Sequence, residues 1–216
     1  MDQGILGQIL SYLTDNMDTY LTAVRDHISI SLLSLAAAIA IGIPFGLMAV
    51  RYGRQEKLIM SFFQVLRILP SLAVLILLIP VMGTGVRPAM TALILLAVPP
   101  ILMNTATGLK QVPAFMLETA YAMGMTEAQV WRKVRFPLAM PLILTGIKTA
   151  TIEIIASATL ASRIGAGGLG DIIFTGLGLY RIDLLVLGGV SAAVLSITAA
   201  LILDLSDRVL LKYKYL

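Results

Sequence analysis

The stretch ISISLLSLAAAIAIGIPFGLMAV, residues 28–50, runs from His27 to Arg51 without a charged side chain. A bilayer core about 30 Å thick is crossed by roughly 20 helical residues at 1.5 Å each, so this stretch is long enough to span it. Two other uncharged stretches of similar length, 88–109 and 184–203, predict two more spans. The sequence therefore predicts an all-α membrane protein.

Two further apolar stretches carry charge inside them. Residues 58–82 contain Arg67, and residues 137–160 contain Lys148 and Glu153. None of these charges stands in a turn or a polar cluster, so we expect both stretches to span as well, which gives about five transmembrane helices. The composition agrees, because only 13% of the 216 residues are charged and 58% are hydrophobic, whereas soluble domains are about a quarter charged.

Several function classes are disfavoured by the residues themselves. The chain has no cysteine and one histidine, His27, so it offers no metal site. Residues 165–170 match G-x-G-x-x-G, but they follow a span and lack the strand, helix and acidic residue of a dinucleotide site. No phosphate-binding loop or catalytic constellation occurs, so we expect no enzyme activity and no cofactor in this chain. Basic residues lie at the ends of apolar stretches, which argues against nucleic acid as a partner.

Those basic residues predict the orientation. One set of span ends carries ten of them and the other set four, and basic loops stay in the cytoplasm. The amino terminus is therefore expected outside and the carboxyl terminus inside. We divide the chain into an external amphipathic segment (1–26), a transmembrane domain (27–208) and a cytoplasmic tail (209–216). The ten cytoplasmic residues are Arg51, Arg54, Lys57, Lys110, Arg132, Lys133, Arg135, Arg208, Lys212 and Lys214.

The cytoplasmic loop 110–136 carries the clearest local signals. Pro113 suits the first turn of a helix, and Gly124 can take the left-handed conformation that ends it. Thr126 and Gln129 have the spacing of a capping box, which predicts a second helix. We expect Pro137 to end that second helix before the fourth span.

The exposed faces of these two helices are expected to carry aromatic, methionine and charged side chains. Such residues at a rigid corner favour protein docking, although an interfacial helix pair resting on lipid headgroups fits equally well. The residues concerned are Phe115, Met116, Glu118, Met123, Trp131, Arg132 and Arg135.

The loop resembles the "EAA" coupling loop of membrane subunits in bacterial ABC importers. The match consists of Glu118-Thr-Ala120, Gly124, the basic stretch and Pro137, with Thr119 in place of the middle alanine. The resemblance implies a type I importer permease fold, with a coupling helix that inserts into a cleft of an ATPase subunit. The ATPase-coupling residues it implies are Glu118, Ala120, Gly124, Trp131, Arg132 and Arg135.

Three more stretches narrow the subfamily. Residues 67–80 (RILPSLAVLILLIP), 104–109 (NTATGL) and 149–171 (TAT…SATLASRIGAGGLGD) together resemble permeases for osmoprotectants such as glycine betaine, carnitine and choline. The resemblance implies a multi-pass plasma-membrane protein with two ATPase subunits that bind ATP and Mg, a second permease subunit and an external solute-binding protein. A methionine-type permease is the alternative within importers, and a passive channel or secondary transporter is the alternative from another class.

Charges inside the membrane should face protein or a water-filled path. Arg67, Lys148, Glu153 and Ser157 are therefore candidates for the translocation pathway, with Glu153 and Ser157 lining the route of a cationic substrate. In the alternative reading, Glu153 pairs with a cation on another helix, such as Arg67, or on a partner subunit. Pro99 and Pro100 predict a kink in the third span.

Overall fold

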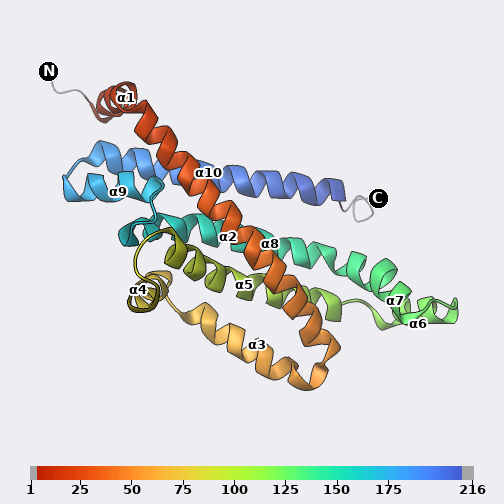
Figure 1. Cartoon of the computed structure of the whole chain (residues 1–216). Helices are drawn as coiled ribbons and strands as arrows, with labels where there is room; N and C mark the ends of the chain where they lie inside the picture. The colour runs from red at the N-terminus through yellow and green to blue at the C-terminus, as the bar shows by residue number, and fades with distance from the viewer. Residues whose placement is uncertain (1–3, 211–216) are drawn as a thin grey trace.

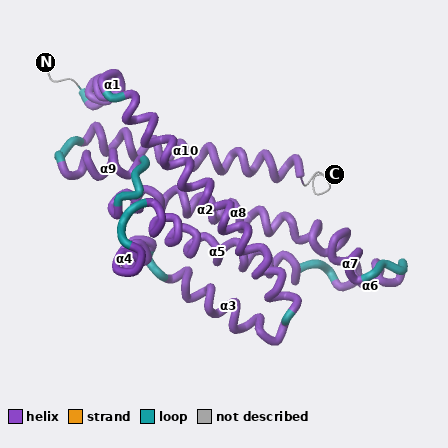
Figure 2. The backbone as a smooth tube through the Cα atoms, in the orientation of Figure 1, coloured by secondary structure: helices purple, strands orange, loops and turns teal. Residues whose placement is uncertain are grey.

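The computed structural model describes residues 4–210, and of residues 53–56 and 210 it describes only the backbone. This part of the chain is helical with no strand (Figure 2). The α-helices are α1 (Ile5–Asp15), α2 (Met17–Arg51), α3 (Gly53–Ile68), α4 (Ser71–Met82), α5 (Val86–Lys110), α6 (Ala114–Ala122), α7 (Glu127–Val130), α8 (Phe136–Ala161), α9 (Leu169–Gly178) and α10 (Ile182–Leu210). A π-helical turn (Trp131–Arg135) joins α7 to α8, and a 3-10 turn (Ser162–Ile164) follows α8.

The centre of the molecule consists of α2, α5 and α8, which cross one another closely (Figure 1). Glycines allow this approach: a Cβ on Gly46 would lie 2.7 Å from Thr105 Cβ, and one on Gly146 would lie 2.8 Å from the Pro100 carbonyl oxygen. Small residues bring helix backbones together in membranes, where packing contacts rather than water drive association. The three helices therefore form the rigid core against which the other elements lie.

Three of the predicted spans correspond to single helices. These are α5, α8 and α10, each longer than the apolar stretch that predicted it, by nine residues in α10. The first span lies within α2, but that helix begins at Met17, eleven residues before Ile28, so the boundary expected at residues 26 and 27 falls inside a helix. The length of the apolar stretch limits the part of the helix that lies in the hydrocarbon core. The helix itself continues for as long as its backbone hydrogen bonds can form. Residues 211–216 of the expected tail lie outside the described residues.

The second expected span is not one straight helix. Lys57–Ile68 and Ser71–Met82 meet at an angle of 97°. Pro70 explains the break, because proline has no N–H to donate and forces the preceding residue into an extended conformation. Leu69 has φ −67° and ψ 128°, as this effect predicts. The stretch 58–82, expected to span, is therefore built from two helices that meet at a sharp angle.

Other prolines are accommodated within helices. α5 continues as one helix through the buried Pro99 and Pro100. Pro137 does not end the second helix of the cytoplasmic loop, because α7, the π-helical turn and α8 form one helix over Glu127–Ile164. Pro137 lies in the first turn of α8 directly after the wider π turn, where a missing N–H is tolerated. The expected break at Pro137 was therefore wrong.

The end of the molecule opposite α6 and α7 is built from α1, α9 and the start of α10 (Figure 1). α1 confirms a short helix before the first span. α9 folds back along α10, with Gly176 against the Cβ of Leu184 and with Leu169 and Ile172 buried. Residues 172–179 are thus mostly a helix packed on α10 and α2.

Candidate functional site

The corner between α6 and α7 has the predicted local structure. Gly124 has φ +79°, and its N–H donates to the Tyr121 carbonyl at 2.9 Å. Thr126 and Gln129 form the capping box: the Thr126 N–H donates to Gln129 Oε1 at 2.8 Å, and the Gln129 N–H donates to Thr126 Oγ1 at 3.4 Å. Ala120 is buried under the corner, where it holds α6 in place. The corner stands at one end of the molecule, away from α1 and α9 (Figure 1).

The outward side of the corner is apolar and acidic. Phe115 and Met123 are 63% and 73% exposed, and Glu118 is exposed as well. Large apolar side chains on a folded surface mark a binding surface when they gather at one place. Arg132 is also exposed, one residue into the π-helical turn.

Two residues predicted for the exposed faces point elsewhere. Trp131 is half-buried and packs against the apolar cluster of Leu109, Ala139 and Ile143. Arg135 is also half-buried, and its guanidinium carbon lies 4.7 Å from the centre of the Trp131 ring. The prediction that both lie on an exposed face was wrong, because the helix continues through Pro137 and turns this stretch toward α2 and α5.

Lys148 has a partner on another helix. Its Nζ donates to Asp204 Oδ1 of α10 at 2.5 Å, and the two side chains are 36% and 48% exposed. Sequence reasoning used Asp204 only as the end of the fifth span, but α10 continues beyond it to Leu210. A lysine inside a membrane commonly pairs with a carboxylate on a neighbouring helix. The position of Lys148 within a predicted span was therefore the sequence signal that pointed to such a partner.

Glu153 and Ser157 lie one helical turn apart on α8. Glu153 is half-buried and Ser157 is 6% exposed. The charge of Arg67, which is exposed at the end of α3, acts on the Glu153 carboxylate. Yet no ion pair joins the two among the residues that the structure describes. Glu153 thus has no ion-pair partner in the part of the chain that the structure describes.

His27 is a core residue rather than an interfacial one. It is 1% exposed, and its Nε2 lies 3.2 Å from the Ile155 carbonyl of α8, to which it can donate. On its other side the ring abuts Gly168, where an added Cβ would come within 3.1 Å of Nδ1. Within residues 4–210, no cluster of three or more metal-ligating side chains occurs. His27 therefore ties α2 to α8 and to the turn before α9.

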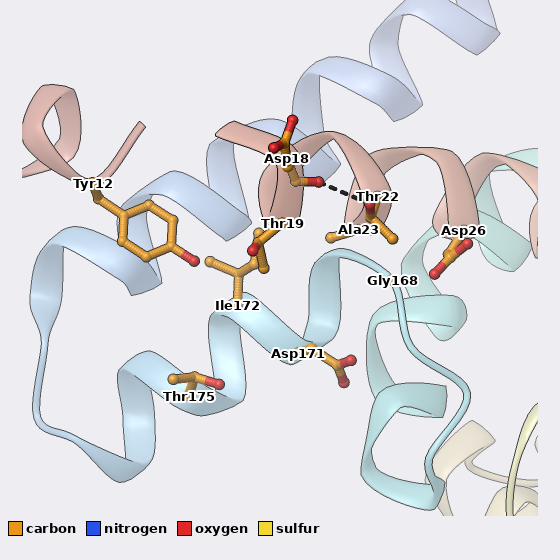
Figure 3. Close-up of a pocket in the computed structure, with 10 residues that line it drawn as sticks. All are labelled: Tyr12, Asp18, Thr19, Thr22, Ala23, Asp26, Gly168, Asp171, Ile172 and Thr175. Carbon is orange, nitrogen blue, oxygen red and sulfur yellow. Dashed lines mark hydrogen bonds between the residues drawn. The ribbon is translucent and has the colours of Figure 1, made fainter. Parts of the chain in front are cut away.

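A cavity of about 410 Å³ opens between α1, α2 and α9 (Figure 3). Asp18 and Asp26 reach it from α2, Asp171 from α9 and Tyr12 from α1. The protein removes part of the water around the exposed Asp171 carboxyl, and Asp26 adds its negative charge, so the pKa of Asp171 is raised.

Residues 38–212 match the family of binding-protein-dependent transport system inner membrane components, and the chain belongs to that family. It is 39% identical over 203 residues to a glycine betaine/carnitine/choline transport system permease protein of Bacillus subtilis, covering 94% of each chain. It is 40% identical over 200 residues to a choline transport system permease protein of the same organism, covering 93% of this chain and 92% of the relative.

Solved structures show the same fold at lower identity. The chain superposes on an inward-facing methionine ABC transporter, MetNI, with a TM-score of 0.74 and 21% identity, covering 88% of this chain and 97% of the other. It superposes on an amino acid ABC transporter with a TM-score of 0.79 and 19% identity, covering 96% and 99%. These matches confirm the predicted fold class. The chain is a multi-pass inner membrane component of an ABC importer, the part that spans the membrane rather than the part that hydrolyses ATP.

Proposed function

We propose that this chain is the permease subunit of an ATP-driven importer for quaternary-ammonium compatible solutes such as glycine betaine, carnitine and choline. The support is the identity of 39–40% over nearly the whole chain to permeases named for these solutes. A methionine-type permease shares the fold at 21% identity, and a shared fold does not fix a substrate. The difference in identity favours the osmoprotectant class.

The α6–α7 corner carries the proposed coupling mechanism. Two cytoplasmic ATPase subunits, which would bind ATP and Mg, dock on the corners of two permease subunits. The exposed Phe115, Glu118 and Met123 supply apolar contact and charge at a site held rigid by Gly124 and the capping box. When the ATPases close, the movement enters the Glu127–Ile164 helix directly, because no loop separates the corner from the membrane.

The remaining partners follow from the orientation that the basic residues favour. With the corner in the cytoplasm, α1 and α9 face the outside, where a solute-binding protein would deliver the substrate. A second permease subunit, identical or homologous, would complete the pathway. Membrane lipid surrounds the exposed apolar faces of α3, α4 and α10.

Within the pathway, we assign the attraction of a cationic substrate to Glu153, with Ser157 one turn beyond it. The assignment is supported by the lack of an ion pair at Glu153 among the described residues, although the Arg67 charge acts on it. Lys148, in contrast, already has Asp204 as its counter-ion, which favours a structural role for that pair. Arg67 would order the inner part of the broken second span.

The test is ATP-dependent uptake by the reconstituted complex. The permease, its copurifying ATPase and the binding protein are placed in vesicles loaded with ATP, and uptake of labelled choline, glycine betaine and methionine is measured. Uptake of choline or glycine betaine should require ATP and stop with a non-hydrolysable analogue. Uptake without ATP would support the channel alternative, and transport of methionine alone would support the methionine-type alternative.

A further inference from the structure

A groove of about 440 Å³ lies between the end of α2 and the π-helical turn, and the coupling mechanism does not use it. Its volume is within the range of small-molecule sites. The lining residues are Pro44, Leu47, Met48, Arg51, Tyr52 and Trp131.

The groove is polar at one end and apolar at the other. Arg51 and Tyr52 stand at the end of α2, whereas Pro44 lies seven residues earlier, about 10 Å along the helix. Between them, Leu47 and Met48 supply an apolar wall. Tryptophan, tyrosine and arginine are the residues that proteins place at the level of lipid headgroups. None of the described residues that line the groove carries a carboxylate.

A second cation lies behind the tryptophan. Arg135 stacks on the Trp131 ring at 4.7 Å, and its Nε is buried without a hydrogen-bond partner in the part of the chain that the structure describes. Arg135 is not among the residues that line the groove, so its charge acts on the groove only from beside the tryptophan. The Arg51 guanidinium thus stands at the headgroup end of a groove whose other end is apolar, with the Arg135 charge beside the tryptophan wall.

We propose that this groove binds one anionic phospholipid, with its phosphate at Arg51 and an acyl chain along Leu47 toward Pro44. The placement in the cytoplasmic leaflet rests on the proposed orientation, whereas the binding itself does not. The bound lipid contacts both α2 and the π-helical turn beside the corner. It therefore fixes the turn through which the coupling movement enters the membrane.

The chain contains its own probe, because Trp131 is its only tryptophan. The full-length chain is placed in vesicles of phosphatidylcholine with increasing fractions of phosphatidylglycerol, in which either one lipid or the other has brominated acyl chains that quench tryptophan. The fraction of brominated phosphatidylglycerol that quenches half of the Trp131 fluorescence should be at least about fivefold lower than that of brominated phosphatidylcholine. Arg51→Gln should remove about a fivefold preference, since one cation at a membrane surface is worth about that much.

The control is Arg208→Gln, which removes an exposed cation near the same end of the molecule but outside the groove. It should leave the preference unchanged, and thermal unfolding shows whether each variant is folded. Equal quenching by both lipids would overturn the proposal in favour of ordinary lipid contact. An equal loss of the phosphatidylglycerol preference in both variants would also overturn the proposal, because general surface charge would then explain the preference. An absence of quenching by either lipid would overturn it too, because protein rather than lipid would then cover the groove. Because both leaflets have the same composition, the result is independent of the orientation and of the transported substrate.

Discussion

Removing Lys148 should destabilise the folded protein through the carboxylate that it leaves behind. In Lys148→Met, Asp204 keeps its charge but loses the Nζ that lies 2.5 Å from its Oδ1. A charged side chain inside the bilayer costs about 3 kcal/mol on insertion scales. The two side chains are 36% and 48% exposed in the isolated chain, so we expect a loss of about 2–3 kcal/mol rather than the larger values of sealed interiors.

For a chain of this length each kcal/mol shifts the melting temperature by about 2–4 °C, so Lys148→Met should melt about 4–12 °C below the parent. The double variant Lys148→Met/Asp204→Leu removes both charges and should recover to within about 1 kcal/mol. Removing Asp204 in the Lys148→Met background should therefore restore about 2 kcal/mol of stability. Thermal unfolding in detergent measures all three proteins.

Lys133→Met is the matched control, since Lys133 is exposed and a change at such a site alters stability by about 0.5 kcal/mol or less. Two results would refute the reasoning: a Lys148→Met variant that melts with the parent, or a double variant no more stable than the single one. If the double variant is stable yet fails to transport, Lys148 has a role in the translocation pathway besides its role in stability.

Four further predictions concern coupling, substrate, pH and orientation. Gly124→Val should leave the protein inserted but uncouple ATP hydrolysis from uptake, because a side chain at φ +79° costs about 1–2 kcal/mol in backbone strain. Asparagine tolerates that conformation, so Gly124→Asn should retain more transport activity. Full transport activity of the valine variant would contradict the role given to Gly124. Glu153→Gln should keep its melting temperature but weaken choline uptake more than glycine betaine uptake, whereas an unstable variant with an unchanged ratio would end the pathway assignment. The raised pKa of Asp171 means that ionisation of this carboxyl opposes folding, so the stabilising contribution of Asp171 is present at low pH and lost as the pH rises through the raised pKa. Asp171→Asn should therefore be more stable than the parent at neutral pH, but not at pH values below the ordinary aspartate pKa. Thermal unfolding across that pH range would show the difference. In this cysteine-free chain, a cysteine at the exposed Tyr180 should react with an impermeant thiol reagent in intact cells and one at the exposed Met123 should not, and the reverse pattern would overturn the orientation.

Features set by a few neighbouring residues could be predicted from the sequence. The corner is the clearest case, because Gly124 and the Thr126–Gln129 pair determine their own backbone conformation almost regardless of the surroundings. The apolar spans were equally accessible, because a stretch without charge is a requirement of the bilayer rather than of the fold.

The effect of each proline could not be predicted, because it depends on tertiary contacts. Pro70 breaks the second span, whereas Pro99 and Pro100 lie inside an intact helix and Pro137 follows a π-helical turn. The same chemistry thus gives different outcomes, according to whether neighbouring groups satisfy the backbone that each proline frees.

The site residues that were misplaced also depended on tertiary contacts. Trp131 was expected on an exposed face, but it packs against Leu109, Ala139 and Ile143, a contact that the local sequence does not reveal. The partner of Lys148 required knowing that α8 and α10 lie side by side and that α10 continues past Asp204. Periodicity along one helix contains neither piece of information.

The unbroken helix Glu127–Ile164 has a mechanical consequence. Its 38 residues span about 57 Å at 1.5 Å each, so the helix acts as a lever arm that reaches from the corner to the opposite end of the molecule. A tilt of about 5° about one end displaces the other by about 5 Å, close to one helical pitch. The Trp131–Arg135 π-helical turn is the one irregular turn near the driven end, and such turns are where helices bend. In the proposed mechanism, the stiffness of this turn would set how much of the ATPase movement reaches the end of the helix beside α9.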